Sequence, residues 1–192
     1  MTDPSDFDNT FMPKSREFIT KYRQIFLDKY FSIDSKILDI GNQDKYELQM
    51  SGLAISSFDI VPDSQADYIG DITTHNTEIP DSFFDGVICM EVLEHTVDPF
   101  AAISEISRIM KPGGYLFVTS PLNARIHGPI PDCWRFTEFG LKLLLRDFQM
   151  IQFEKFNTPD RNLFPLHYAA IVRKQPNQEI SDPRKIKFEP VD

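Results

Sequence analysis

The sequence predicts a doubly wound α/β fold, in which a mostly parallel seven-stranded sheet carries helices on both faces. Short apolar runs alternate with longer amphipathic segments, and this alternation is typical of parallel strands joined by helices. The length of 192 residues fits one domain, because a chain of this size buries a substantial core. We expect that domain over residues 15–174, with a flexible arm over residues 1–14 and a tail over residues 175–192.

The two ends of the chain have compositions that disfavour regular structure. Residues 1–14 combine three aspartates with two prolines, which favours an irregular arm. Residues 175–192 contain three prolines and few apolar side chains. That composition is typical of a solvated tail.

Three segments carry helix signals. From Ser15 to Tyr30 apolar side chains recur at helical spacing, so they would form one buried face. A second helix should follow Asp98 as its N-cap, with Pro99 in the first turn, and a third should follow Thr137. The seven candidate strands are KILDIG, AISSFDI, DYIGDI, DGVICM, GYLFVTS, MIQFEKF and HYAAIVRK.

Composition and charge argue against several classes of protein. A formal charge of −9 and a pI near 4.9 would repel a nucleic-acid backbone. The apolar runs are far shorter than the roughly 20 residues of a membrane helix, and the N-terminus lacks a secretory signal pattern. Cys89 and Cys133 do not have the paired spacing of a zinc or dithiol site. We expect a cytoplasmic protein with reduced thiols, no metal site, and neither nucleic acid nor membrane as a partner.

Acidic side chains follow the first four predicted strands. These strands end near Asp39, Asp59, Asp71 and Glu91, and ligands of open α/β sheets bind beyond the C-terminal ends of the strands. Asp59 lies 18 residues after Gly41, a spacing at which a carboxylate can accept hydrogen bonds from both ribose hydroxyls of a nucleoside. Taken alone, an Asp is more often a cap or turn residue. The combination predicts an adenosine-type pocket.

Four strings stand in the order and spacing of a known family. They are ILDIG, FDI, GDIT and FFDGVICMEVLEHTVDPFAAISEISRIMKPGGYLFVTSP. They resemble the first motif, the ribose-binding acid, the adenine-contacting segment and the fourth-to-fifth-strand block of class I S-adenosylmethionine-dependent methyltransferases, in the small-molecule, "type 11"-like branch. The resemblance covers about residues 36–148. It implies a Rossmann-like sheet whose final strand runs antiparallel beside the fifth.

The same resemblance implies S-adenosylmethionine as the cofactor. Asp59 would hold the ribose hydroxyls and Asp71 would meet the adenine amino group. Ile60 and Ile72 would sandwich the adenine ring. These four residues form the expected nucleoside side of the site.

The edge of the cofactor nearest the substrate would be lined by Met90, Glu91 and His95, again by resemblance. His95 is also a candidate catalytic residue. A second interpretation stays open for it, because a histidine early in a helical segment is often a packing or capping residue.

The glycine loop after the first strand departs from the family pattern. Asp39 and Gly41 would shape the loop on the methionine side. The family usually has three glycines at alternate positions here, but this chain continues after Gly41 with Asn42, Gln43 and, further on, Lys45. Asn tolerates left-handed backbone geometry, so the turn can persist. Gln43 would narrow the pocket, whereas Lys45 could pair with the cofactor carboxylate.

A long loop over residues 121–137 follows the fifth strand, and loops of this length in compact domains are usually functional or mobile. It resembles loops of methyltransferases from polysaccharide and small-metabolite pathways. We consider His127 as a base, Asp132 as an acid, Trp134 as an aromatic wall and Arg135 as an anion clamp. The structural alternatives are a turn cap for His127, a core plug for Trp134, and an ion pair of Arg135 with Asp132.

These observations favour methyl transfer from S-adenosylmethionine to a small-molecule acceptor, such as a sugar or another pathway metabolite. The alternative is a catalytically impaired, methyltransferase-like binding or scaffolding subunit, which the altered glycine loop would explain. The strand-end acids argue against that alternative, because packing alone does not require them. A nicotinamide-dependent oxidoreductase fits less well, because the G-x-G-x-x-G turn is absent.

Overall fold

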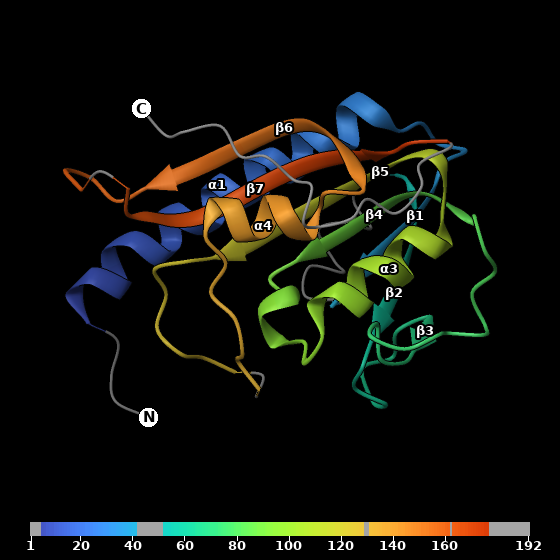
Figure 1. The fold of residues 1–192 in the computed structure, drawn as a ribbon, viewed down its shortest axis with the longest axis horizontal. Coiled ribbons are helices and arrows are strands. Elements are labelled where there is room, and N and C mark those ends of the chain that lie inside the picture. The colour runs from blue at the N-terminus through green and yellow to red at the C-terminus, as the bar shows by residue number, and fades with distance from the viewer. Residues whose placement is uncertain (1–4, 42–51, 129–130, 162, 177–192) are drawn as a thin grey trace.

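Seven strands form one sheet in the order β3-β2-β1-β4-β5-β7-β6 in the computed structural model (Figure 1). The structure describes residues 5–41, 52–128, 131–161 and 163–176. The strands are β1 (Lys36–Ile40), β2 (Ala54–Asp59), β3 (Tyr68–Ile69), β4 (Phe84–Met90), β5 (Met110–Pro121), β6 (Phe148–Asn157) and β7 (Pro165–Lys174). Each expected strand is therefore found at its expected place in the chain.

The sheet is mostly parallel, as predicted. Neighbours among β1 to β5 pair in parallel, whereas β7 pairs antiparallel with both β5 and β6. In the β5–β7 pair, Thr119 lies opposite Ala169 and Pro121 lies opposite His167. The strand order reverses between the adjacent strands β1 and β4, and such a switch point opens a crevice at the carboxyl ends of the strands.

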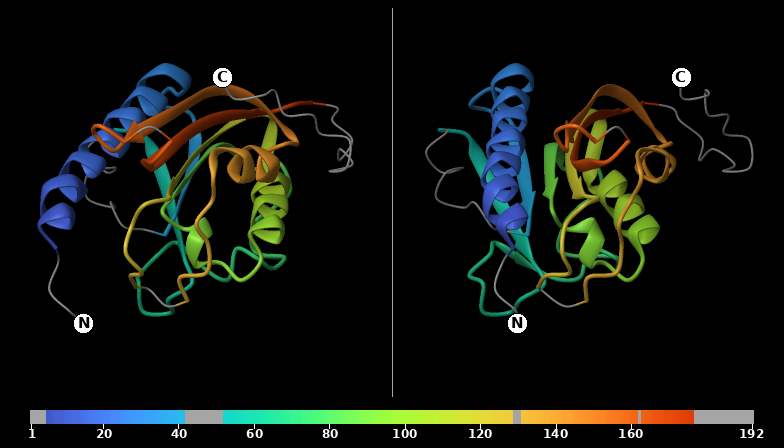
Figure 2. Two further views of the ribbon diagram at one scale, coloured as in Figure 1. Left: turned by 60° about the vertical axis from the view of Figure 1, so that its left-hand side comes forward. Right: turned by 90° about the vertical axis from the view of Figure 1, so that its left-hand side faces the viewer.

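Helices cover both faces of this sheet (Figure 2). On one face, α1 packs Phe26 and Leu27 into a cluster with Phe117 and Ile171 of the sheet. On the other face, a larger apolar cluster joins the sheet to α3 and α4. The helices are α1 (Asp6–Tyr30), η1 (Leu93–His95, a 3₁₀ helix), α3 (Pro99–Ile109) and α4 (Glu138–Leu144).

Helix α1 begins earlier than the composition predicts. Residues 6–14 are helical rather than an irregular arm, so this part of the predicted domain boundary is wrong. The Ser5 hydroxyl accepts the N–H of Asp8 at 3.2 Å, and the Asp8 carboxylate accepts the N–H of Ser5 at 3.0 Å. This reciprocal capping box stabilises the helix start, and Pro13 is tolerated inside the helix although it has no N–H to donate.

Other local expectations are confirmed. The Asp98 carboxylate accepts the N–H of Ala101 at 3.0 Å, and the Thr137 hydroxyl caps α4 in the same way at 3.2 Å. Cys89 is buried within β4 and Cys133 is exposed, and both are free thiols. Among the described residues, no helix combines the length and apolar character that crossing a membrane would require.

The contact of α1 with the sheet predicts a large effect of Phe26→Ala. Phe26 is fully buried and its ring stacks on that of Phe117, with 5.5 Å between the centroids. Removing a buried aromatic ring costs about 3–5 kcal/mol of unfolding free energy, which urea denaturation followed by circular dichroism would measure. The control is Phe100→Ala on α3, where the ring is 50% exposed and the loss should stay below about 1 kcal/mol. Equal losses for the two variants would contradict the packing described here.

Candidate functional site

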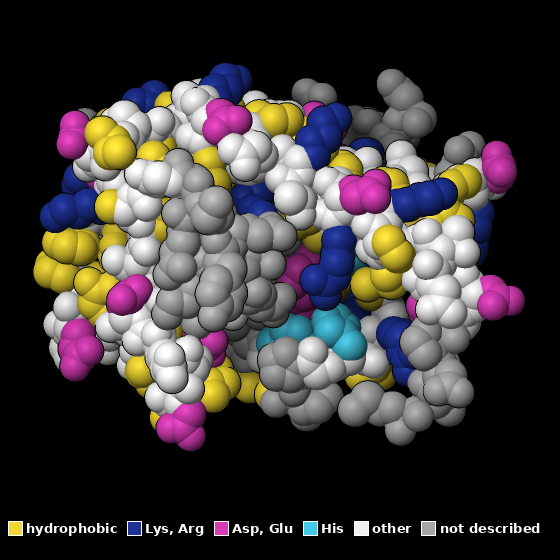
Figure 3. All heavy atoms as spheres, turned by 180° about the vertical axis from the view of Figure 1, so that it is seen from behind, with side chains coloured by type: hydrophobic (Ala, Val, Ile, Leu, Met, Phe, Trp, Pro, Cys, Tyr) yellow, Lys and Arg dark blue, Asp and Glu magenta, His cyan; other side chains and the backbone are white. Residues whose placement is uncertain are grey.

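Two adjoining cavities open at the carboxyl ends of the parallel strands. The β2-side cavity has a volume of about 290 Å³ and is lined by the ends of β1, β2 and β3 and by the segment after β4. The α1-side cavity has a volume of about 730 Å³ and is lined by α1, by residues after β4 and β5, and by the start of β7. Glu91 and His95 line both cavities. Figure 3 shows histidine and acidic side chains gathered in a hollow of the molecule.

Asp59 and Asp71 both line the β2-side cavity, as the predicted nucleoside pocket requires. Oδ1 of Asp59 accepts the N–H of Val61 at 2.9 Å, and Oδ1 of Asp71 accepts the N–H of Thr73 at 2.8 Å. Each aspartate therefore uses one carboxylate oxygen to stabilise the turn that follows it in the chain. The other oxygen of each carboxylate accepts no hydrogen bond from the described residues, so it can accept one from a ligand.

Apolar side chains also line the β2-side cavity, and the chain is closely packed at Gly41. Ile60 is 63% exposed and Ile72 is buried, and both side chains line the cavity. Gly41 has φ +96°, and a Cβ atom at this position would lie 2.9 Å from Cγ2 of Val92. Only glycine satisfies both conditions without strain, which agrees with the expected role of Gly41 in the turn.

The other residues predicted for the cofactor side lie at different places relative to the two cavities. Asp39 is buried within β1 and lines neither cavity. Met90 lines the α1-side cavity. Asn42, Gln43 and Lys45 lie outside the described residues, so their predicted roles stay predictions.

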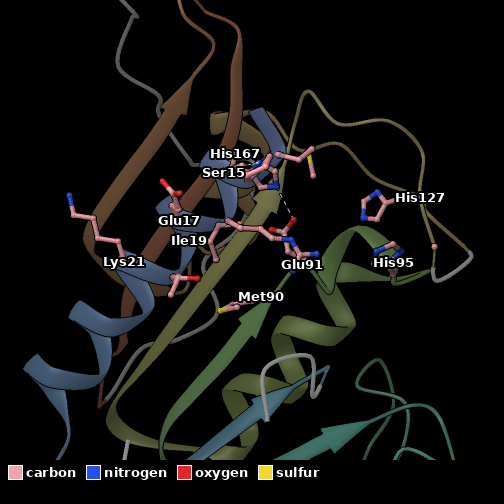
Figure 4. Close-up of a pocket in the computed structure, with 14 residues that line it drawn as sticks. Ser15, Glu17, Ile19, Lys21, Met90, Glu91, His95, His127 and His167 are labelled. Carbon is pink, nitrogen blue, oxygen red and sulfur yellow. Dashed lines mark hydrogen bonds and ion pairs between the residues drawn. The ribbon is translucent and has the colours of Figure 1, made fainter. Parts of the chain in front are cut away.

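A chain of hydrogen-bonded side chains lies at the α1-side cavity (Figure 4). Glu91, directly after β4, accepts the hydroxyl of Thr119 at 2.8 Å with Oε1. Its Oε2 lies 2.9 Å from Nε2 of His167 in β7, and Nδ1 of His167 bonds the hydroxyl of Ser15 in α1. Thr119, His167 and Ser15 are all buried. Three elements therefore converge on the Glu91 carboxylate.

The pKa values of Glu91 and Glu94 are shifted in opposite directions although the two residues are close in the chain. Burial opposes the ionisation of Glu91, but the hydrogen bond and charge of His167 and the Thr119 hydroxyl hold its pKa below the ordinary value. Burial and the neighbouring Glu91 carboxylate raise the pKa of Glu94 well above its ordinary value. Both carboxylate oxygens of Glu94 are buried without a hydrogen-bond partner. The structure therefore favours the charged form of Glu91 and disfavours that of Glu94.

His95 and His127 lie edge to face, with ring centroids 5.0 Å apart. Nδ1 of His95 is 3.0 Å from the carbonyl oxygen of Pro131. Because a carbonyl can only accept, this nitrogen carries the proton in the neutral ring and Nε2 is the basic nitrogen. Glu94, His95 and His127 offer atoms within 4.8 Å of one another, a grouping that could hold a metal ion.

The loop residues predicted for the substrate side are engaged with one another. Both oxygens of Asp132 bond the guanidinium of Arg135, the second at 2.7 Å, so the structural alternative of an ion pair is the one observed. The indole N–H of Trp134 donates to the carbonyl oxygen of Thr96 at 2.8 Å, and its ring is 40% exposed. None of these three residues lines either cavity, whereas His127 lines the α1-side cavity.

Sequence reasoning missed Ser15, Thr119 and His167 as site residues. His167 stands at the start of the last predicted strand, and an antiparallel strand begins at the edge where its parallel neighbours end. The predicted direction of that strand therefore contained a usable signal for His167. Ser15 interrupts the apolar face of α1, which is a much weaker signal.

The strand order, its switch point and the acids at the strand ends together define an open α/β protein with a cavity at the carboxyl edge of its sheet. A family model described as "Methyltransferase domain" matches residues 47–118. The ubiquinone biosynthesis O-methyltransferase of Proteus mirabilis is 27% identical over 133 residues, covering 59% of this chain and 51% of that protein. That of Vibrio atlanticus is 37% identical over 57 residues, covering 30% of this chain and 24% of that protein.

Solved structures share the fold over much longer stretches. A S-adenosylmethionine-dependent methyltransferase of Archaeoglobus fulgidus superposes with a TM-score of 0.64 and 19% identity, covering 88% of this chain and 98% of that one. Another, of Methanosarcina mazei, has a TM-score of 0.61 and 21% identity, covering 77% and 96%. The chain spans only about half, or less, of the length of the curated relatives it matches. The matched family model and the shared fold make this chain similar to S-adenosylmethionine-dependent methyltransferases.

The Asp132–Arg135 pair predicts a pH-dependent contribution to stability. Hydrogen bonds from Arg135, opposed by burial, together with the N–H of His127 lower the pKa of Asp132 from 3.8 to about 2. A lowered carboxyl pKa stabilises the fold above the unfolded-state pKa, and this contribution is lost as pH falls through the folded-state pKa. Asp132→Asn should therefore cost about 2 kcal/mol at pH 7, because one pKa unit corresponds to about 1.4 kcal/mol.

The difference in unfolding free energy between wild type and Asp132→Asn should shrink as pH falls from about 4 to about 2, the range set by the two pKa values. Urea denaturation at several pH values would measure it. Asp34→Asn, at an exposed position, is the matched control and should have little effect. A difference that does not depend on pH would show that the pair does not act through the charge of Asp132.

Proposed function

We propose that this protein transfers the methyl group of S-adenosylmethionine to a small-molecule acceptor bound in the α1-side cavity. The observation that carries the proposal is the junction of two cavities at Glu91 and His95. One cavity has the features of a nucleoside site, and the other is large enough for a separate ligand. Its volume of about 730 Å³ lies within the usual range of small-molecule pockets, roughly 300–1,000 Å³.

The residues of the β2-side cavity fit the nucleoside part of the cofactor. Asp59 and Asp71 each offer one carboxylate oxygen without a partner among the described residues. Ile60 and Ile72 supply apolar surface, and Gly41 forms a turn next to Val92 in which a Cβ atom would clash. When bound, the cofactor supplies a methyl group already activated by its positive sulfur, so the protein mainly has to orient the acceptor.

An oxygen acceptor would require a base, and His95 is the better placed of the two candidate histidines. It lines both cavities, whereas His127 lines only the larger one. The bond between Nδ1 and the Pro131 carbonyl leaves Nε2 free of a proton in the neutral ring. The curated relatives are O-methyltransferases by name, which supports a hydroxyl acceptor. We propose that Nε2 of His95 accepts its proton.

The direct test of the cofactor site is Asp59→Ala. Charge-assisted hydrogen bonds are worth about 1.5–3 kcal/mol each, so loss of this carboxylate should weaken S-adenosylmethionine binding by about 10- to 100-fold. Isothermal titration calorimetry measures the affinity. Asp63→Ala is the control, because Asp63 is exposed, follows Asp59 by four residues and lines neither cavity. Equal affinity of wild type and Asp59→Ala would refute the pocket assignment, and no binding by wild type would favour the scaffolding alternative.

The role of His95 predicts a selective loss of turnover. His95→Gln should lower kcat by about 100-fold, the lower end of the usual contribution of a general base, while S-adenosylmethionine affinity changes little. Transfer of labelled methyl from S-adenosylmethionine to a hydroxylated metabolite identified by screening provides the measurement. His75→Gln is the control, because its side chain is 62% exposed and outside both cavities. Unchanged kcat in His95→Gln would exclude His95 as the base.

A further inference from the structure

The boundary between the two cavities is formed in part by an acid. Glu91 and His95 are the residues that line both cavities. A methyl group that moves from a cofactor in one cavity to an acceptor in the other must cross at this junction. The sulfur that releases the methyl group therefore has to lie close to it. Glu91 is thus in a position to act on the charge of that sulfur.

The surroundings of Glu91 favour its ionised form. Its carboxylate accepts from Thr119 of β5 at 2.8 Å and lies 2.9 Å from Nε2 of His167 of β7, while Ser15 of α1 bonds the far nitrogen of that ring. The side chain of Glu91 is 20% exposed and that of His167 is 3% exposed. Hydrogen bonds to the charged form of an acid stabilise that form most where solvent is excluded.

Other titratable groups face this carboxylate from the neighbouring elements. They are His167 on β7, His127 and Arg135 on the loop after β5, Glu94 and His95 on η1 and Cys89 on β4, while Arg16, Glu17 and Lys21 of α1 line the same cavity. Burial raises the pKa values of Glu94 and Cys89, whereas the hydrogen bonds of Glu91 lower its pKa. Of the acids that lie at the junction of the two cavities, Glu91 is therefore the one whose surroundings favour the charged form.

The backbone of Glu91 gives independent support for a functional role. Its φ is +53°, in the left-handed region that residues other than glycine, asparagine and aspartate rarely adopt. Such a strained conformation occurs most often at functional sites. It positions the carboxylate directly after β4, at the edge shared by the cavities.

We propose that the Glu91 carboxylate is the counter-charge of the cofactor's sulfonium, and that His167, supported by Ser15, is the residue that positions it. This inference rests on the proposed function. During transfer, a lone pair of the acceptor forms the new bond to the methyl carbon while the pair of the carbon–sulfur bond returns to sulfur. A proton of a hydroxyl acceptor passes to His95. The cofactor product is a neutral thioether, so Glu91 binds it less well and product release is favoured.

A purely structural interpretation of the same hydrogen bonds is that they only stabilise the packing of α1 against the sheet. The two interpretations differ in one measurable quantity, the ratio of affinities for S-adenosylmethionine and S-adenosylhomocysteine. Hydrogen bonds with only a packing role would stabilise the fold without changing the relative affinities for the two ligands. A counter-charge distinguishes them, because only one carries a positive sulfur.

Isothermal titration with these two ligands tests the proposal on wild type, Glu91→Gln and Glu94→Gln. Wild type should prefer S-adenosylmethionine, and Glu91→Gln should lose about tenfold of that preference, mostly through weaker S-adenosylmethionine binding. Glu94→Gln is the matched control: it replaces a neighbouring buried acid that lines neither cavity. Its affinity ratio should equal that of wild type.

The outcomes separate this inference from the proposed function. If wild type binds both ligands and Glu91→Gln keeps the wild-type ratio, the counter-charge is wrong and the proposed function stands. Equal affinities of wild type for the two ligands would likewise show that the counter-charge is wrong while the proposed function stands. If wild type binds neither ligand, the proposed function fails and the inference fails with it.

A pH series provides a second test that does not require Glu91→Gln to fold. The pKa of Glu91 is lowered, so its charge is present at neutral pH and is lost as pH falls through that pKa. The preference of wild type for S-adenosylmethionine should therefore be constant near neutrality and decline on acidification. His167→Gln keeps an N–H donor but cannot carry a charge, so the decline should begin at higher pH. Identical pH profiles for wild type and His167→Gln would overturn the positioning role.

Discussion

Parallel pairing of β2, β1, β4 and β5 is the constraint on which the site depends. Because these strands run in the same direction, the residues that follow them emerge at one edge of the sheet, however far apart they lie in the sequence. The register places Ile40 opposite both Phe58 and Cys89, and Met90 opposite Thr119. The strand ends are therefore level with one another, and the two cavities open directly beyond them.

The antiparallel last strand completes the site from the other direction. Since β7 runs against β5, its first residues reach the edge where β4 and β5 end, and His167 lies opposite Pro121. His167 thereby meets Glu91, 76 positions away in the chain, and Ser15, 152 positions away. The same contacts hold α1 against the sheet and keep one buried acid ionised. One set of hydrogen bonds thus both packs α1 against the sheet and lowers the pKa of the Glu91 carboxyl group.

The family resemblance was informative for one cavity and much less so for the other. Asp59, Asp71, Ile60 and Ile72 were assigned to a nucleoside pocket from spacing and motif, and all four line the β2-side cavity. The α1-side cavity takes its lining from α1, β7 and a loop, segments with no strong motif. Solved structures with about 20% identity share the fold, so the sheet is common to them and to this chain.

The sequence by itself determined the fold class, the seven strands, two of the helix caps and the strand-end acids, because periodicity, capping and spacing are local properties of the chain. It did not determine where α1 begins, since the Ser5–Asp8 capping box outweighs the prolines. Nor did it determine that Arg135 is paired with Asp132, or that the pKa values of Glu91 and Glu94 shift in opposite directions. Only the tertiary structure decided these points, because the charge state of a carboxyl group depends on its burial and on partners that folding brings from distant parts of the chain.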